Sequence, residues 1–114
     1  MGLLNRLRTW RRHTITARYA SPADVPDHLR RRDVALTGTP QHPKWLVFDC
    51  PCRRGHRVML NLDRSIRPAW RVNGDLHTPL TITPSIDEHS AYGHCHYWIT
   101  RGTVRWVERK DTPR

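Results

Sequence analysis

Three short segments of the chain concentrate side chains that can do chemistry. One carries thiols, one carries a hydroxyl after proline, and one carries imidazoles and a thiol: Cys50-Pro51-Cys52, Thr83-Pro84-Ser85-Ile86 and His94-Cys95-His96-Tyr97-Trp98-Ile99. Gathered at strand ends, such groups can form a nucleophile site, a metal site, or both. The spacing and the surrounding elements must distinguish these possibilities.

Ser85 and His96 are the candidates for a nucleophile and its base. Ser85 stands just where the strand-like run 76–83 stops, and another strand begins at His96. If these strands pair antiparallel, the two residues lie near facing positions, where Cβ atoms are about 5 Å apart. An imidazole at that distance can take the hydroxyl proton as the oxygen attacks a carbonyl, and can return it to the leaving amine.

Such a pair normally has supporting groups. The sequence offers three candidates for a group that orients the imidazole and does not choose among them: Asp49, Asp87 and Glu88. Backbone N–H groups of the loop after Ser85, starting at Ile86, are the expected oxyanion contacts. The alternative is structural, because serine after proline is an ordinary turn residue and histidine beside Tyr-Trp-Ile is often packed in a strand. No GxSxG-type elbow or other known serine signature decides between them.

The thiols and the neighbouring histidines define a second candidate site. Two thiols follow the run 45–48, and two further soft donors come from a distant loop, so the predicted ligands are Cys50, Cys52, His94 and Cys95, with His56 as a possible substitute. Structural zinc takes four such ligands. The C-x-C spacing is weaker evidence than paired C-x-x-C, and a free cysteine also behaves as a small hydrophobic residue. Structural zinc and simple burial both stay open.

The elements that would hold these groups are mainly β-strands. From Asp33 onward, brief apolar runs rich in Val, Ile, Thr, Trp and Tyr are split by Gly, Pro and Asn-Gly. We expect strands at 15–19, 33–37, 44–49, 56–62, 69–73, 76–83, 96–101 and 103–108. Asn73-Gly74 is the clearest hairpin turn, and Arg101-Gly102 makes a second one. The predicted fold is mainly β (α+β minor), a small antiparallel sheet or partly open barrel whose tryptophans pack in the core.

Two short helices are expected before and beside the first strand. Leu3, Leu4, Leu7 and Trp10 recur at helical spacing between arginines, and 21–24 has the order of a helix start, with an end near Arg30. Pro26 would make the second helix short or irregular. The chain is therefore divided into a basic amphipathic segment, 1–13, a single β-rich domain, 14–108, and a flexible tail, 109–114.

Composition narrows the functional classes. The 114 residues form one small domain, and no apolar run has membrane-spanning length. The first residues lack the features of a secretory signal, and three cysteines, an odd number, favour reduced thiols, so we expect a cytoplasmic protein. Net charge is +10, and residues 1–32, with eight Arg and two Asp, contribute +6 of it. A diffuse positive field attracts nucleic acid without encoding a site for it.

Several unusual motifs occur in one order along the chain: Trp45…Phe48-x-Cys50-Pro51-Cys52, Leu60-Asn61-Leu62, Trp70, Leu80-Thr81-x-Thr83-Pro84-Ser85-Ile86, His96-Tyr97-Trp98-Ile99 and Gly102…Val104-x-Trp106. Jointly they resemble a small bacterial family called BubE, whose members accompany ubiquitin-like conjugation (Bub) operons. The resemblance runs from about Ile15 to Val107, which is nearly the whole domain.

The chain departs from the family pattern at two places. The family's first motif reads Cys-Pro-Cys-Gly-Cys-Gly, and a further cysteine stands three positions before the histidine of the last motif. Here Arg53-Arg54 occupies the Gly-Cys positions, and Gly93 replaces the later cysteine. A metal centre is therefore less expected here than in the relatives, whereas Ser85 and His96 are intact. The resemblance favours the hydroxyl site, which requires no cofactor, over the metal site.

What the resemblance implies is a serine-dependent peptidase-like protein that cuts at the C-terminal tail of a ubiquitin-like protein, either maturing a precursor or releasing a conjugate. An extended tail would dock beside a sheet edge and bring its carbonyl to Ser85. The expected partners are the ubiquitin-like protein and its E1- and E2-like enzymes. Two other classes stay open: a non-catalytic zinc- or thiol-containing adaptor of the same pathway, and a basic nucleic-acid-binding module.

Overall fold

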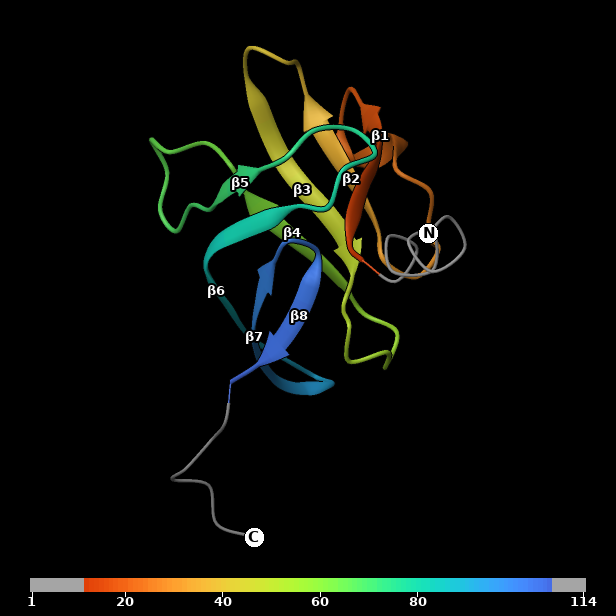
Figure 1. Cartoon of the computed structure of the whole chain (residues 1–114), viewed down its shortest axis with the longest axis vertical. Helices are drawn as coiled ribbons and strands as arrows, with labels where there is room; N and C mark the ends of the chain where they lie inside the picture. Colours follow the sequence, from red (N-terminus) through yellow and green to blue (C-terminus); the bar gives the residue numbers. More distant parts are fainter. Residues whose placement is uncertain (1–11, 108–114) are drawn as a thin grey trace, which may run out of the picture.

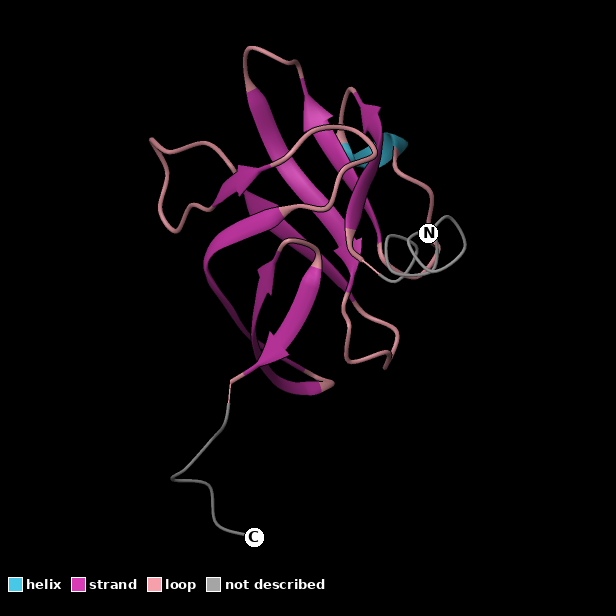
Figure 2. Cartoon of the chain, viewed as in Figure 1, coloured by secondary structure: helices cyan, strands magenta, loops and turns pink. Residues whose placement is uncertain are grey.

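The computed structural model of the chain describes residues 12–107, and nearly all of its regular secondary structure is β-strand, joined by loops (Figures 1 and 2). Its strands are β1 (Thr14–Tyr19), β2 (Asp33–Gly38), β3 (Pro43–Asp49), β4 (Arg57–Asn61), β5 (Arg71–Asn73), β6 (Thr81–Ser90), β7 (Gly93–Thr100) and β8 (Thr103–Trp106). The expected mainly β fold is confirmed. Among these residues, no helix has the length and apolar character needed to cross a membrane.

The strands form two four-stranded sheets, in the orders β1-β2-β3-β4 and β5-β6-β7-β8, and no closed barrel is present within residues 12–107. All pairs are antiparallel except β1 with β2. Arg101-Gly102 makes the predicted tight turn, since Thr100 pairs with Thr103 and both turn residues have positive φ, as this hairpin turn requires.

The main core lies between the two sheets and takes side chains from both. Buried aliphatic and aromatic residues at alternate positions of the central strands meet there, because successive side chains of a strand point to opposite faces: Val34, Leu36, Leu46, Phe48, Val58 and Leu60 from the first sheet, and Ile82, Ile86, Cys95, Tyr97 and Ile99 from the second. A smaller cluster of Val25, Ala35 and Val47 covers the outer face of the first sheet. On the outer face of the second sheet, β7 presents His94, His96 and Trp98, which alternate with its buried residues.

The predicted helix over 21–30 is wrong, because the structure contains only a 3₁₀ helix, η1, at Pro22–Asp24. Ser21 is the extended N-cap residue and proline stands at the first helical position, as the sequence indicates. The helix stops because Pro26 has no N–H to donate and its ring disfavours helical backbone at Val25, whose φ and ψ are −74° and 132°. The helix predicted within 3–10 and the tail 109–114 lie outside the described residues.

The predicted boundaries around the candidate serine are also wrong. Instead of strands at 76–83 and 96–101, β6 continues to Ser90 and β7 begins at Gly93, so the two form one long hairpin. Asn73-Gly74 is not a tight hairpin turn, because Asn73 pairs with Thr81 and the intervening residues form a longer loop. That loop reaches the first sheet, where Ile15 bridges to Leu76.

Acid is expected to destabilise the fold through His13. The ring is buried and packs edge-on against Phe48, and burial, followed by the charge of Arg32, lowers the pKa of His13 to about 4. Unfolded chains protonate histidine below a pH of about 6.5, so the neutral buried ring contributes stability above that pH, and the contribution is lost as pH falls toward 4. At pH 5 we expect a loss of about 2 kcal/mol from this residue.

Urea unfolding at pH 7 and pH 5 measures this contribution. His13→Gln should reduce the pH dependence of the free energy of unfolding by about that 2 kcal/mol, whereas His42→Gln, at an exposed position, should leave it unchanged. Equal pH dependence of the wild type and His13→Gln would contradict the expectation.

Candidate functional site

The Ser85 hydroxyl and the His96 imidazole meet on the outer face of the second sheet. Ile82 pairs with Ile99 and Ile86 pairs with Tyr97, so residues 83–85 of β6 stand opposite Trp98 alone, which makes a bulge. Ser85 Oγ lies 2.9 Å from Nε2 of His96. The two residues expected near facing positions are thus hydrogen-bonded, although they lie within a continuous hairpin and not beside a loop.

The bulge is fixed from the side by Trp70. Its indole N–H donates a hydrogen bond of 3.3 Å to the carbonyl oxygen of Ser85. Both Ser85 and His96 are half-buried, so the hydroxyl rests on a supported backbone and stays reachable from solvent. With the imidazole neutral and Nε2 unprotonated, the serine hydroxyl is the donor in this pair. This is the geometry that activation of a serine by a histidine requires.

Asp87 is an acidic residue on the same face as this pair. It stands directly opposite His96 in the β6–β7 ladder. Its carboxylate Oδ1 contacts Nε2 of His94 and lies 3.7 Å from Nε2 of His89. The hydrogen bond from His94, together with the positive charges that His96, His94 and His89 can carry, holds the pKa of Asp87 below its ordinary value. Asp87 therefore presents a negative charge beside the imidazole of His96.

The other supporting candidates lie elsewhere or are limited to backbone. Asp49 is at the end of β3 in the first sheet, where its carboxylate accepts hydrogen bonds from the backbone N–H of Leu29 and from Nε of Arg57. The side chain of Ile86 is buried in the core, so only its backbone N–H could face a substrate. Glu88 points to the inner face, where its Oε1 lies 3.4 Å from Nδ1 of His56.

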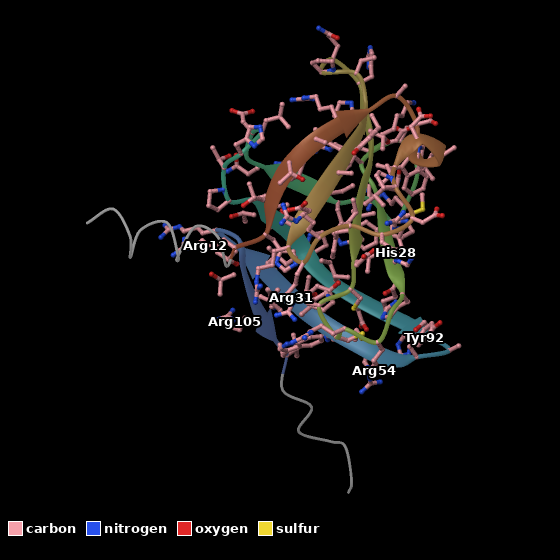
Figure 3. The ribbon with its side chains drawn as sticks, turned by 90° about the vertical axis from the view of Figure 1, so that its right-hand side faces the viewer. Arg12, His28, Arg31, Arg54, Tyr92 and Arg105 are labelled. Carbon is pink, nitrogen blue, oxygen red and sulfur yellow. The ribbon has the colours of Figure 1, made fainter. Side chains whose placement is uncertain are left out.

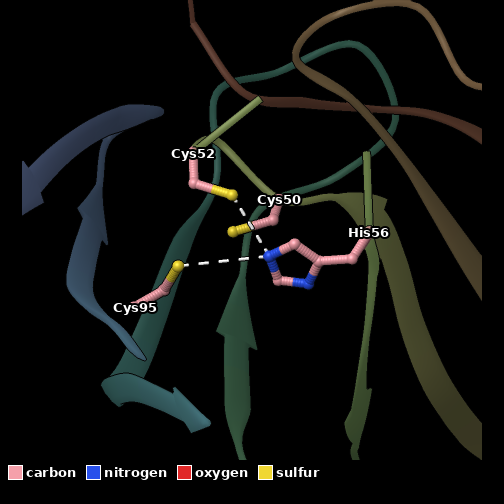
Figure 4. A group of neighbouring side chains, drawn as sticks. All are labelled: Cys50, Cys52, His56 and Cys95. Atoms are coloured by element: carbon pink, nitrogen blue, oxygen red, sulfur yellow. Dashed lines mark hydrogen bonds between the residues drawn. The ribbon is translucent and has the colours of Figure 1, made fainter. Parts of the chain in front are cut away.

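The thiols form a separate cluster at one end of the core, and their histidine is His56, the possible substitute, instead of His94. Cys50, Cys52, Cys95 and His56 bring one donor atom each within 4.8 Å of one another (Figure 4). Nε2 of His56 is 3.1 Å from Sγ of Cys52 and 4.0 Å from Sγ of Cys95. His94 instead joins Asp87 and His89 on the outer face. Of the four predicted donors, three come together and His94 does not.

Burial governs the protonation of this cluster. It raises the pKa of the Cys50 thiol to about 12, and it also raises the pKa of Cys95. The nearby phenol of Tyr97 is buried and has a raised pKa for the same reason. The three cysteines are not joined by disulfides. Burial therefore favours the protonated thiols of Cys50 and Cys95 unless a positive charge displaces their protons.

A groove of about 930 Å³ lies next to the serine and was not foreseen from the sequence. Its lining includes Pro84, which precedes Ser85, but not Ser85 itself. Apolar rings form its walls and three guanidinium groups surround it: Trp70, Pro84 and Trp98 with Arg64, Arg67 and Arg71. The expectation that the tryptophans are core residues holds only in part, since Trp70 packs against the core on one side and faces this groove on the other. Trp106 is 48% exposed.

Comparison with known proteins yields one match. The family model described as BubE, bacterial ubiquitination-like system serine protease, matches residues 21–107, which is more than half of the 114 residues. No curated protein and no solved structure matches the chain. The matched range includes β2 to β8 and therefore both the serine–histidine pair and the thiol cluster.

Proposed function

The chain belongs to the BubE family of bacterial ubiquitination-like system serine proteases, and we propose that Ser85 and His96 are its nucleophile and base. The observation that carries this proposal is the 2.9 Å contact between Ser85 Oγ and His96 Nε2. A hydroxyl is a weak nucleophile at neutral pH, and a base within hydrogen-bond distance is the usual means of activating it.

The proposed reaction is acyl transfer in two steps. Ser85 Oγ bonds to the carbonyl carbon as its proton passes to His96 Nε2, and the imidazolium then gives that proton to the leaving group as the scissile bond breaks. Water hydrolyses the resulting ester with His96 acting again as the base. Asp87, opposite His96 on the neighbouring strand, favours the imidazolium by its negative charge, so we assign it an electrostatic role.

The substrate we propose is the C-terminal tail of a ubiquitin-like protein, either in a precursor or in a conjugate. The groove beside Ser85 supports this assignment, because an extended peptide can lie between Trp70 and Trp98 with its scissile carbonyl at the bulge. The surrounding Arg64, Arg67 and Arg71 favour a tail that carries carboxylates next to its apolar residues. Partner enzymes of the conjugation system belong to the same proposal.

A ubiquitin-like protein with an electrophile in place of its C-terminal carboxylate tests the assignment. We expect a covalent adduct on Ser85, identified as a mass increase on the peptide that contains this residue. Arg71→Glu, at an exposed position of the groove, should slow the labelling several-fold, whereas Arg18→Glu, at an exposed position of β1, should not. An adduct on Cys52, or no adduct on the folded protein, would contradict the proposed nucleophile.

A further inference from the structure

We propose that Cys50, Cys52, His56 and Cys95 bind a structural zinc ion that joins the two sheets. This site is distinct from the serine–histidine pair, which lies on the opposite face of β7. Three sulfur donors and one imidazole nitrogen converge inside the protein, and this ligand type and number are those of closed, four-coordinate zinc sites. Cys50 and Cys95 are 4% and 3% exposed, so solvent cannot complete the coordination.

The spacing of the donor atoms matches a zinc tetrahedron. With Zn–S distances of about 2.3 Å and a Zn–N distance of about 2.0 Å, the edges of such a tetrahedron measure about 3.5 to 3.8 Å. The four donors lie within 4.8 Å of one another, with 3.1 Å from Cys52 Sγ and 4.0 Å from Cys95 Sγ to the same nitrogen of His56. Shifts of an ångström or less would therefore give bonding geometry.

The second nitrogen of His56 supports the same assignment. Oε1 of Glu88 is buried, has no hydrogen-bond partner within the described part of the chain, and lies 3.4 Å from Nδ1 of His56. Histidines that bind zinc through one nitrogen usually donate the other N–H to a carboxylate or carbonyl, which fixes the tautomer and the ring orientation. Nε2, which faces the three thiols, is thereby left free to coordinate the metal.

The ligands come from parts of the chain that only the fold brings together. Cys50, Cys52 and His56 belong to the connection between β3 and β4 of the first sheet, and Cys95 belongs to β7 of the second. The same two regions touch at the surface, where Arg54 donates a hydrogen bond to the carbonyl of Tyr92 and the ring of Tyr92 stacks on His56 at 5.2 Å (Figure 3). A zinc ion here would fasten the β3–β4 connection to the β6–β7 hairpin.

The remaining alternative is that the thiols are only buried hydrophobic groups. That alternative leaves Nε2 of His56 with thiol partners alone, at 3.1 Å from Cys52 Sγ and 4.0 Å from Cys95 Sγ, and a thiol is a weak hydrogen-bond donor. It also gives no reason for four soft donors to converge at one point. Binding of zinc resolves this, because the metal takes the nitrogen lone pair and the thiols release their protons to solvent.

The outer group of Asp87, His89 and His94 has no thiol and two exposed members, so it serves as the control set.

The test is the zinc content of the full chain. Protein purified without chelator, incubated with zinc sulfate and freed of excess metal should hold zinc at one ion per chain by elemental analysis. Cobalt substitution should give the visible absorption bands of tetrahedral cobalt with thiolate ligands. The absence of bound zinc, or a cobalt spectrum without thiolate bands, from protein that is folded by circular dichroism would overturn the proposal.

Two matched histidine variants identify the ligand set. His56→Gln should lower zinc affinity at least tenfold and change the cobalt spectrum, whereas His94→Gln should keep both as in the wild type. Should His56→Gln fail to fold, the wild-type zinc content and cobalt spectrum still decide the question. Unchanged zinc affinity in folded His56→Gln, or lost zinc in folded His94→Gln, would exclude the ligands that we assign.

Discussion

Ser85→Ala is expected to lower the rate of cleavage of a ubiquitin-like fusion by about 10⁴-fold or more, because it removes the oxygen that we propose forms the covalent bond. The fold should not change. The hydroxyl is half-buried and makes a side-chain hydrogen bond to His96, so its loss should alter the free energy of unfolding by about 1 kcal/mol or less. Cleavage followed by gel densitometry and urea unfolding measure the two quantities.

The matched control is Ser90→Ala on the same strand. Ser90 lies near the hairpin turn, where its hydroxyl accepts a hydrogen bond from the N–H of Tyr92, and it is remote in register from His96. This variant should cleave at the wild-type rate. If Ser85→Ala still cleaves the fusion, Ser85 is not the nucleophile. This conclusion holds whether Ser90→Ala is active or inactive.

The two members of a nucleophile–base pair act as a unit, and this gives a second check on the same prediction. His96→Ala should lose about as much activity as Ser85→Ala, and the double variant should lose little more, because either change alone ends covalent catalysis. Losses that multiply would mean that the residues act independently, which the 2.9 Å hydrogen bond argues against.

The strand content of the fold follows from local pattern, but the boundaries around the serine do not. Val, Ile, Tyr and Trp at alternating positions predict strands because their side chains suit a half-buried pleated surface. The run 76–83 predicts a strand that stops just before Pro84, because proline cannot donate a hydrogen bond to a strand ladder. In the structure Pro84 lies in the bulge between Ile82 and Ile86, where the ladder is already interrupted. A bulge depends on pairing with a partner strand, which local sequence does not encode.

The choice between the two candidate histidines, His94 and His56, depends on where β7 begins, which is Gly93 in the structure instead of the predicted His96. His94 stands next to Cys95, so adjacency suggested a shared site. Neighbouring residues of a strand point to opposite faces, and Cys95 is buried in the core while His94 lies on the outer face beside Asp87. Strand alternation therefore excludes His94 as a partner of Cys95. It leaves His56, four residues after Cys52, as the imidazole of the cluster.

The groove of arginines and tryptophans could not be foreseen, because its walls come from different segments.

Withdrawal of zinc is expected to destabilise the whole domain. A ligand that binds only the folded state at about 1,000 times its dissociation constant adds about 4 kcal/mol to the free energy of unfolding, so a strong chelator should remove at least that amount. Urea unfolding with zinc, with chelator and after zinc is restored measures the effect. Magnesium should not restore stability, because it prefers oxygen ligands to thiolates.

Cys95→Ala provides the control, since chelator should shift its unfolding midpoint far less than that of the wild type. Identical midpoints of the wild type with and without chelator would show that no metal supports the fold.

Loss of the metal should also slow the reaction of Ser85. Cys95 and His96 are adjacent on β7 and face opposite sides, and Glu88, which contacts His56, lies three residues after Ser85 on β6. The proposed zinc ion thus holds both strands of the hairpin from the inner face, while the hydroxyl and the imidazole meet on the outer face. Partial loosening of the hairpin would separate the Ser85 hydroxyl from the His96 imidazole, and their reaction depends on contact at hydrogen-bond distance. Slower labelling of Ser85 in chelator-treated protein that is still folded would therefore show this coupling.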